Sequence, residues 1–136
     1  MAARLLARAP RTEAELAARL VARGYHPTTA SATVARCREL GYVGDGSFAH
    51  DRARALRARG AGSLKIAADL TTRGLPEALV TAAVDESRDG LPEIEWARRA
   101  LALADEAVVA GPRSWRLLAG RGFPEEVVVD LLGEPE

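Results

Sequence analysis

The chain has 136 residues, which is enough for one domain or for a short array of small repeats. Its single cysteine, Cys37, excludes an intramolecular disulfide, and no stretch approaches the roughly 20 apolar residues that span a bilayer. A net charge of zero and a pI of about 6.8 argue against free nucleic acid as the sole partner. We therefore expect a soluble cytoplasmic protein.

The charges are unevenly distributed along the chain. Residues 1–44 hold seven Arg and three Glu, for +4; residues 45–90 hold seven cations and seven acids, for 0; residues 91–136 hold five Arg and nine acids, for −4. One interpretation is a scattered, solvated surface. The other is an oriented contact with a charged partner, which is favoured because the imbalance follows the repeat boundaries given below.

Three helices are predicted in the first segment. A short helix rich in Arg and Leu opens the chain and is broken near Pro10. Thr12 and Glu15 have the spacing of a capping box, which predicts a helix over 13–23 with two leucines on one face. The third helix is expected from near Thr28 to Leu40.

The central segment predicts three more helices, over 45–59, 64–73 and 77–87. Asp45 or Ser47 is expected to cap the first of them, and Ser63 the second. Arg52 falls inside the apolar arc of the first helix, which conflicts with simple burial of that arc.

The last segment follows a break at 88–92 and predicts helices over 93–109, 114–121 and 125–132. A turn is expected at Gly111-Pro112. Trp96 and Trp115 lie on apolar stripes and are interpreted as core anchors.

An Arg-Gly-apolar triplet closes the second helix of each segment: Arg23-Gly24-Tyr25, Arg73-Gly74-Leu75 and Arg121-Gly122-Phe123. The glycines lie 50 and then 48 residues apart, with a leucine four residues before each and a proline two or three residues after. A glycine that is free to adopt positive φ can end a helix, and a proline favours the start of the next. This fixed period is the signature of a repeat architecture.

The expected fold is therefore all-α, with three tandem three-helix, helix-turn-helix-like repeats over 1–44, 45–90 and 91–136. Each unit is too small to bury its apolar faces alone, so an elongated or curved array is expected in which the repeats share a continuous buried seam. Tyr42 and Phe48 are assigned to the core that bridges the first two repeats.

No enzyme chemistry is indicated. The stretch 60–65 lacks the spacing of a phosphate-binding loop, and no strand precedes it. His26, His50 and Cys37 are too few for a zinc site, so no metal, cofactor or catalytic residue is expected. The chain has no Asn or Gln, the residues that most often recognise adenine, which weakens an assignment as a sequence-specific DNA-binding protein.

Motifs of all three segments, in order and over nearly the whole chain, resemble the RecX family of regulators of the RecA recombinase. The motifs are Leu5-Leu6-Ala7-Arg8 with Arg11-Thr12-x-x-Glu15-Leu16, then Gly41-Tyr42-Val43-Gly44-Asp45-Gly46-Ser47-Phe48-Ala49, then Gly60-x-Gly62-x-x-Lys65-Ile66-x-x-x-Leu70-x-x-x-Gly74, then Glu95-x-Ala97-x-x-x-Leu101 and Leu117-Leu118-x-x-Arg121-Gly122-Phe123.

The resemblance implies a modular helical protein that binds the groove of the RecA filament on single-stranded DNA. It also implies that the protein restrains filament growth, ATP hydrolysis and strand exchange in recombination, DNA repair and the SOS response. On this reading the chain is a non-enzymatic monomer that meets single-stranded DNA mainly in complex with RecA.

The candidate contacts with filament or DNA are Arg54, Arg57, Arg59 and Lys65 in the central repeat, with Arg36 and Arg38 from the basic end. The alternative for each of them is a solvated helix face. Two other functions stay open: a direct DNA-binding module of tandem helix-turn-helix units, whose affinity would fall steeply with salt, and a scaffold for an unrelated protein.

Overall fold

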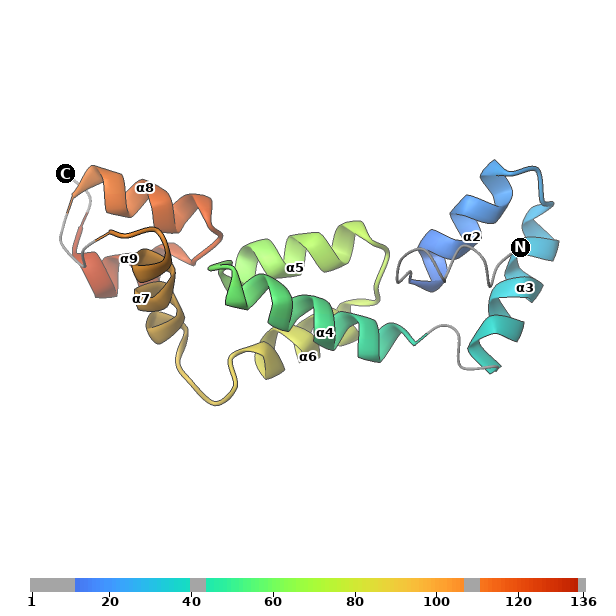
Figure 1. Ribbon diagram of the computed structural model, residues 1–136, viewed down its shortest axis with the longest axis horizontal. Coiled ribbons are helices and arrows are strands. Elements are labelled where there is room, and N and C mark those ends of the chain that lie inside the picture. The colour runs from blue at the N-terminus through green and yellow to red at the C-terminus, as the bar shows by residue number, and fades with distance from the viewer. Residues whose placement is uncertain (1–11, 40–43, 107–110, 135–136) are drawn as a thin grey trace.

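The computed structural model describes residues 12–39, 44–106 and 111–134. Over these ranges the chain forms eight helices and no strand, and the helices follow one another in an elongated array (Figure 1). The predicted all-α repeat architecture is confirmed. The short helix expected before Pro10 and the core position assigned to Tyr42 lie outside the described residues.

In the first repeat, α2 (Glu13–Ala22) packs against α3 (Pro27–Glu39). The predicted capping box is present: Thr12 Oγ1 accepts a hydrogen bond from the Glu15 backbone, and the Glu15 carboxylate accepts one from the Thr12 backbone. The two predicted leucines are fully buried, and Cys37 is buried with them.

The central repeat consists of α4 (Asp45–Ala58), α5 (Ser63–Thr72) and α6 (Glu77–Ser87). The expected caps are wrong, because the N-cap residues are Gly44 and Gly62. The side chains of Asp45 and Ser63 instead form hydrogen bonds with the neighbouring repeats.

The third repeat consists of α7 (Glu93–Leu103), α8 (Pro112–Gly120) and α9 (Glu125–Leu132). The expectation that its first helix continues to about 109 is wrong. Asp105 has a φ of +60°, and the Glu106 amide donates back to the Leu101 carbonyl over 2.8 Å, which closes the helix. Aspartate tolerates this left-handed conformation better than most residues.

The three Arg-Gly-apolar triplets end their helices with the same backbone conformation and the same hydrogen bond. Their glycines have φ values of +99°, +84° and +91°. The amide of each following apolar residue donates to the carbonyl of the leucine five residues earlier, over 3.1–3.3 Å. The repeated leucine and glycine therefore mark a common helix-ending motif.

The expectation of one continuous buried seam is wrong for the described residues. Three separate clusters of buried side chains form, centred on α2 with α3, on α4 to α6, and on α7 to α9. Trp96 and Trp115 are partly buried against the third cluster, and Phe48 is partly buried against the central one. Polar contacts dominate the junctions between the clusters.

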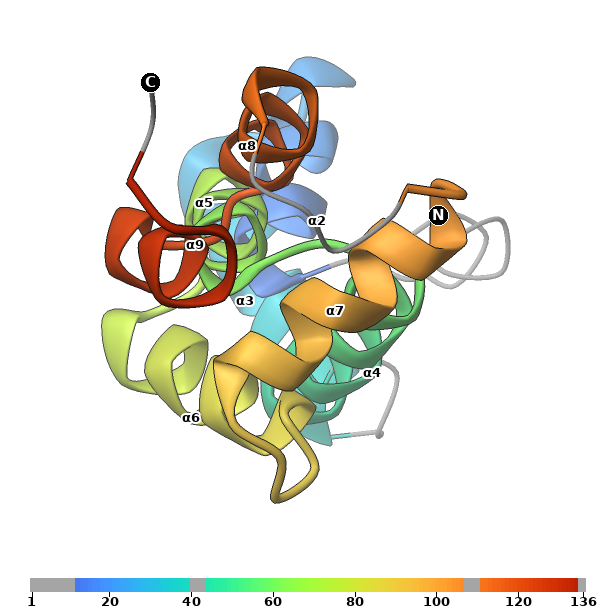
Figure 2. The ribbon, with the colours of Figure 1, turned by 90° about the vertical axis from the view of Figure 1, so that its left-hand side faces the viewer.

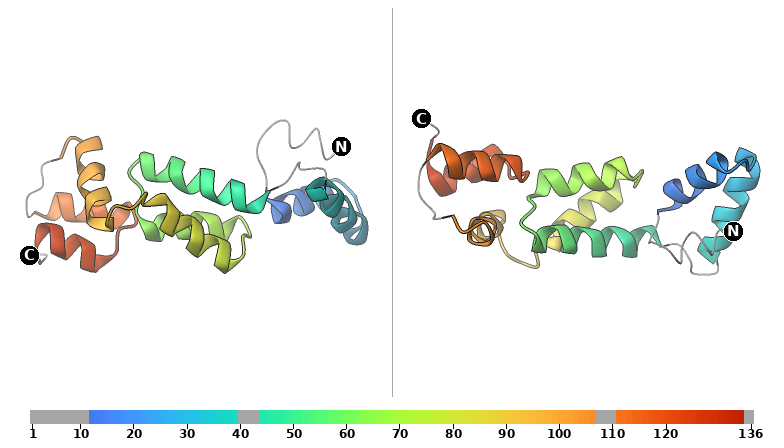
Figure 3. Two further views of the ribbon diagram at one scale, coloured as in Figure 1. Left: turned by 90° about the horizontal axis from the view of Figure 1, so that it is seen from below. Right: turned by 45° about the horizontal axis from the view of Figure 1, so that its top comes forward.

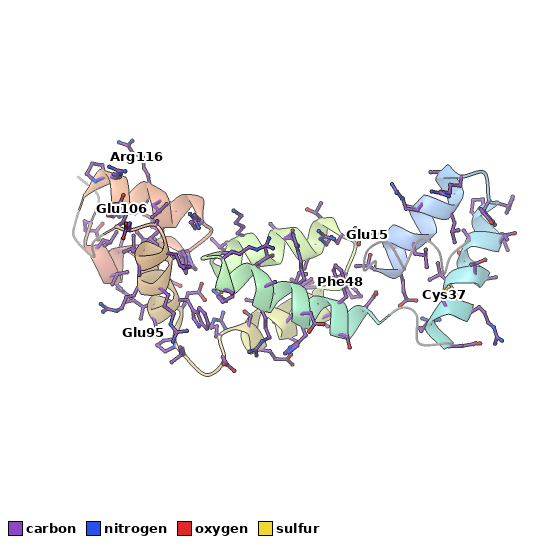
Figure 4. All side chains as sticks on the ribbon, in the orientation of Figure 1. Glu15, Cys37, Phe48, Glu95, Glu106 and Arg116 are labelled. Atoms are coloured by element: carbon purple, nitrogen blue, oxygen red, sulfur yellow. The ribbon has the colours of Figure 1, made fainter. Side chains whose placement is uncertain are left out.

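At the first junction, the start of α2 meets the end of α5. Thr12 Oγ1 donates to the Arg73 carbonyl over 2.9 Å, and the Arg73 guanidinium pairs with Glu15 at 3.4 Å. The Glu13 amide donates to Asp45 Oδ1 over 3.0 Å. Figure 4 places Glu15 and Phe48 at this end of the central repeat.

Arg52 lies beside the same junction, and its contacts explain how an arginine can stand within the apolar arc of α4. Its guanidinium donates two hydrogen bonds of 3.1 Å to Asp69 on α5, so an arginine fits at the edge of the apolar arc. These bonds from Arg52 lower the pKa of Asp69, and Arg73 also donates to this carboxylate. Arg73 in turn lies 5.4 Å from the centre of the Phe48 ring.

At the second junction, the start of α5 meets the end of α8. The Gly62 and Leu64 amides donate to the Arg121 and Gly122 carbonyls over 2.7 and 2.9 Å. Arg121 Nη1 donates to the Arg59 carbonyl over 3.0 Å. A triplet therefore lies at each junction. The backbone carbonyl of its arginine accepts a hydrogen bond from the N-cap residue of the second helix in the preceding repeat.

These two junctions align the second helices of the repeats. The C-terminal turn of α8 faces the N-terminus of α5, and the C-terminal turn of α5 faces the N-terminus of α2 (Figure 3, right). Carbonyls without a partner in their own helix, at a C-terminus, thus meet hydrogen-bond donors at the N-terminus of the neighbouring helix. This head-to-tail arrangement also places the negative end of one helix dipole next to the positive end of the other, which is favourable. This arrangement holds the array extended.

Candidate interaction surface

Five of the six predicted contact cations are exposed: Arg36 and Arg38 on α3, Arg54 on α4, Arg59 just after it, and Lys65 on α5. Arg59 caps the C-terminus of α4 and Lys65 lies in the first turn of α5, on the two sides of the loop between these helices. Arg36 and Arg38 lie on the helix at the far end of the array (Figure 1). The candidates therefore lie along two repeats, and they do not form a single cluster.

Arg57 is the exception, since it is only 2% exposed, and its prediction as an outward-facing contact is wrong. Its Nη1 pairs with Glu93 Oε2 at 2.9 Å, its Nη2 donates to Ser63 Oγ over 2.9 Å, and its Nε donates to Ser87 Oγ over 3.2 Å. A projection of α4 alone places Arg57 beside the solvated face. The third repeat, which supplies Glu93, covers that position.

Glu93 is the centre of this buried polar network. It accepts hydrogen bonds from the Ser63 amide and hydroxyl, and it also pairs with Arg88 at 3.0 Å. Burial alone would raise the pKa of Glu93, but the hydrogen bonds from Ser63 and Arg57 outweigh it and lower the pKa. The ionised carboxylate thus joins α4, α5 and α7.

The exposed cations differ in their own partners. Arg36 pairs with Glu39 at 3.3 Å, Arg38 with Glu13 at 3.1 Å, and Arg54 with Asp89 at 3.7 Å. Exposed pairs of this kind contribute about 0–1 kcal/mol each, so an acidic partner can displace them. Arg59 and Lys65 have no carboxylate partner within the described residues, so their charges are fully available.

Two further cations of this kind, on the second helices of the first and third repeats, were not predicted. Arg19 on α2 and Arg116 on α8 are exposed and form no ion pair with any described residue. Figure 4 shows Arg116 pointing away from the body of the third repeat. Both lie on the second helix of their repeat, and their position on its outer face was the signal that could have identified them.

The described residues contain no group of three or more His, Cys, Asp or Glu side chains that could hold a metal ion. None of the helices in the described ranges has the length and apolar content needed to cross a membrane.

The sequence of the chain is similar to those of several known proteins. Residues 1–37 match the family model described as RecX, first three-helix domain. A regulatory protein RecX from Halorhodospira halophila is 30% identical over 93% of this chain and 81% of the relative. Those from Chromohalobacter salexigens and Thermus thermophilus are 33% and 36% identical, over 93% and 95% of this chain and 85% of each relative. This identity extends through all three repeats, and the chain belongs to the RecX family of regulatory proteins.

Proposed function

We propose that this protein binds the filament that the RecA recombinase forms on single-stranded DNA and restrains its growth, ATP hydrolysis and strand exchange. Membership of the RecX family is the observation that carries the proposal. The protein acts by occupying the filament groove as a regulator that catalyses no reaction and needs no cofactor. It works as a monomer in the cytoplasm and meets DNA mainly within the filament.

The extended shape supports groove binding. A row of three repeats with hydrogen-bonded junctions presents a long surface with little freedom to bend, so less conformational entropy is lost when it lies along a polymer. A compact bundle of the same helices would reach fewer filament subunits.

The exposed cations are the proposed contacts: Arg54, Arg59 and Lys65 in the central repeat, and Arg36 and Arg38 in the first. Arg59 and Lys65 are the strongest candidates, since no described carboxylate neutralises them. Arg57 has a different proposed role: it holds the third repeat in place through Glu93.

The ATPase activity of RecA on single-stranded DNA tests the proposal. Titration with this protein is expected to inhibit ATP hydrolysis at less than one molecule per recombinase monomer, because one bound array covers or caps several subunits. Full activity at a molar excess of the protein would contradict filament binding.

A charge-removal variant tests the proposed contacts. Arg59→Ala combined with Lys65→Ala is expected to weaken filament binding by about tenfold, measured by co-sedimentation at moderate salt. The matched control, Arg98→Ala with Arg113→Ala, removes the same charge from two exposed arginines that pair with Glu95 and Glu106 in the third repeat. An equal loss of filament binding in both double variants would show that net charge, and not these two positions, causes the effect. Steep, salt-dependent binding to naked DNA would favour a DNA-binding module instead.

A further inference from the structure

A surface hollow of about 520 Å³ lies between the central and third repeats. Figure 2, seen from the end with the C-terminus, shows α7 crossing in front of α4. The residues that line the hollow come from these two helices: Arg57, Ala58, Trp96, Arg99, Ala102 and Leu103. We name it the α4–α7 hollow.

The lining combines an apolar surface with a free cation. Leu103 is 61% exposed, the largest value among the exposed large apolar side chains of the described residues. It lies on the same side of α7 as Trp96, seven residues earlier, and the small side chains of Ala58 and Ala102 also line the hollow. Arg99 has no carboxylate partner within the described residues, whereas the charge of Arg57 is neutralised by Glu93.

The hollow exists only while the two repeats keep their relative position. Arg57, which lines the hollow, pairs with Glu93 of the third repeat, and Trp96 Nε1 donates to the Arg88 carbonyl over 2.9 Å, which fixes the indole. A preformed site of this kind loses little entropy when a side chain enters.

The chemistry fits a protein segment better than a nucleobase. Two guanidinium groups already lie over the Trp96 ring, Arg99 at 4.7 Å and Arg57 at 5.7 Å from its centre, so the ring is not free for base stacking. The other lining residues are aliphatic, and Arg99 supplies a single positive charge that no described carboxylate neutralises. That combination is complementary to a bulky apolar side chain next to a carboxylate.

We propose that the α4–α7 hollow receives an apolar side chain from a subunit of the recombinase filament, with an adjacent carboxylate pairing with Arg99. This inference rests on the proposed function and specifies where on the third repeat the protein partner is held. It adds an apolar anchor to the electrostatic contacts of the first and central repeats.

Two pairs of variants test the site. Leu103→Ala and Arg99→Gln are each expected to weaken binding to the loaded filament by about tenfold or more, as for other partly enclosed anchor residues. The matched controls are Leu64→Ala, which removes a leucine 58% exposed on α5, and Arg98→Gln, which removes the neighbouring charge on α7. Both controls are expected to change binding by less than about twofold. Circular dichroism and thermal melting of each variant check that the fold is kept.

The outcomes are distinguishable. If the wild-type protein binds the filament and the Leu103 and Arg99 variants bind as well as their controls, the hollow is not a binding site, and the proposed function stands. Absence of wild-type binding would overturn both. Binding to single-stranded DNA alone that falls in Arg99→Gln but not in Leu103→Ala would assign the hollow to nucleic acid and overturn a protein partner.

Discussion

Replacing Glu93 with alanine is expected to lower the free energy of unfolding by about 3–5 kcal/mol, because it leaves the Arg57 guanidinium buried without a countercharge. The Arg57 side chain is only 1% exposed and that of Glu93 11%, so water cannot replace the lost carboxylate. The Ser63 amide and hydroxyl would lose their acceptor as well. Urea unfolding followed by circular dichroism measures the effect.

Two comparisons separate this cause from others. Glu95→Ala breaks a pair with Arg98 that is nearly half exposed on the same helix, and it is expected to cost less than about 1 kcal/mol. Combining Glu93→Ala with Arg57→Met removes both buried charges and is expected to recover most of the loss. A double variant as unstable as Glu93→Ala alone would show that the buried charge is not the cause.

The same network predicts a pH dependence. The pKa of Glu93 is lower in the folded protein than its ordinary value of 4.5. The stabilisation that its ionised carboxylate contributes is therefore complete above pH 4.5. It is lost as the pH falls through the lowered, folded-state pKa. The difference in stability between the wild type and Glu93→Ala should therefore be constant near pH 7 and shrink in acid.

The helices were largely predictable because their signals are local. The Arg-Gly-apolar period predicted the ends of the second helices, and α6 and α9 have the expected bounds. The end of α7 was missed because Asp105, and not a glycine, takes the left-handed conformation. The stretch after it also contains no proline or glycine before Gly111, so nothing in the sequence signalled a stop.

The contacts between repeats were not predictable in the same way. Arg57 meets Glu93 across 36 positions of the chain, and a helical projection of α4 contains no information about α7. The polar junctions, found in place of the expected apolar seam, were not predictable for a related reason. Backbone carbonyls and amides form many of their bonds, and every residue type except proline carries both groups. The repeated arginines were visible, but their role at the junctions was not.

Gly122→Ala is expected to lower the free energy of unfolding by about 2–5 kcal/mol. Its φ of +91° alone costs an alanine about 1–2 kcal/mol. In addition, a Cβ at this position would overlap the Cα, Cβ and backbone nitrogen of Lys65, and overpacking against backbone adds about 1–3 kcal/mol. The bonds from Gly62 and Leu64 to this turn would then lengthen, so the third repeat should separate from the central one.

Gly24→Ala is the matched control, because it changes the same triplet position in the first repeat. Its φ of +99° imposes the same conformational cost, but an added Cβ meets nothing within 4 Å, so only about 1–2 kcal/mol should be lost. Both tryptophans lie in the third repeat, so their fluorescence reports on that unit, whereas circular dichroism reports on all helices. If the junction couples the repeats, the two signals should unfold together in Gly24→Ala and at different urea concentrations in Gly122→Ala. Coincident transitions in both variants, with equal losses of stability, would show that the close approach of Gly122 to Lys65 does not hold the array together.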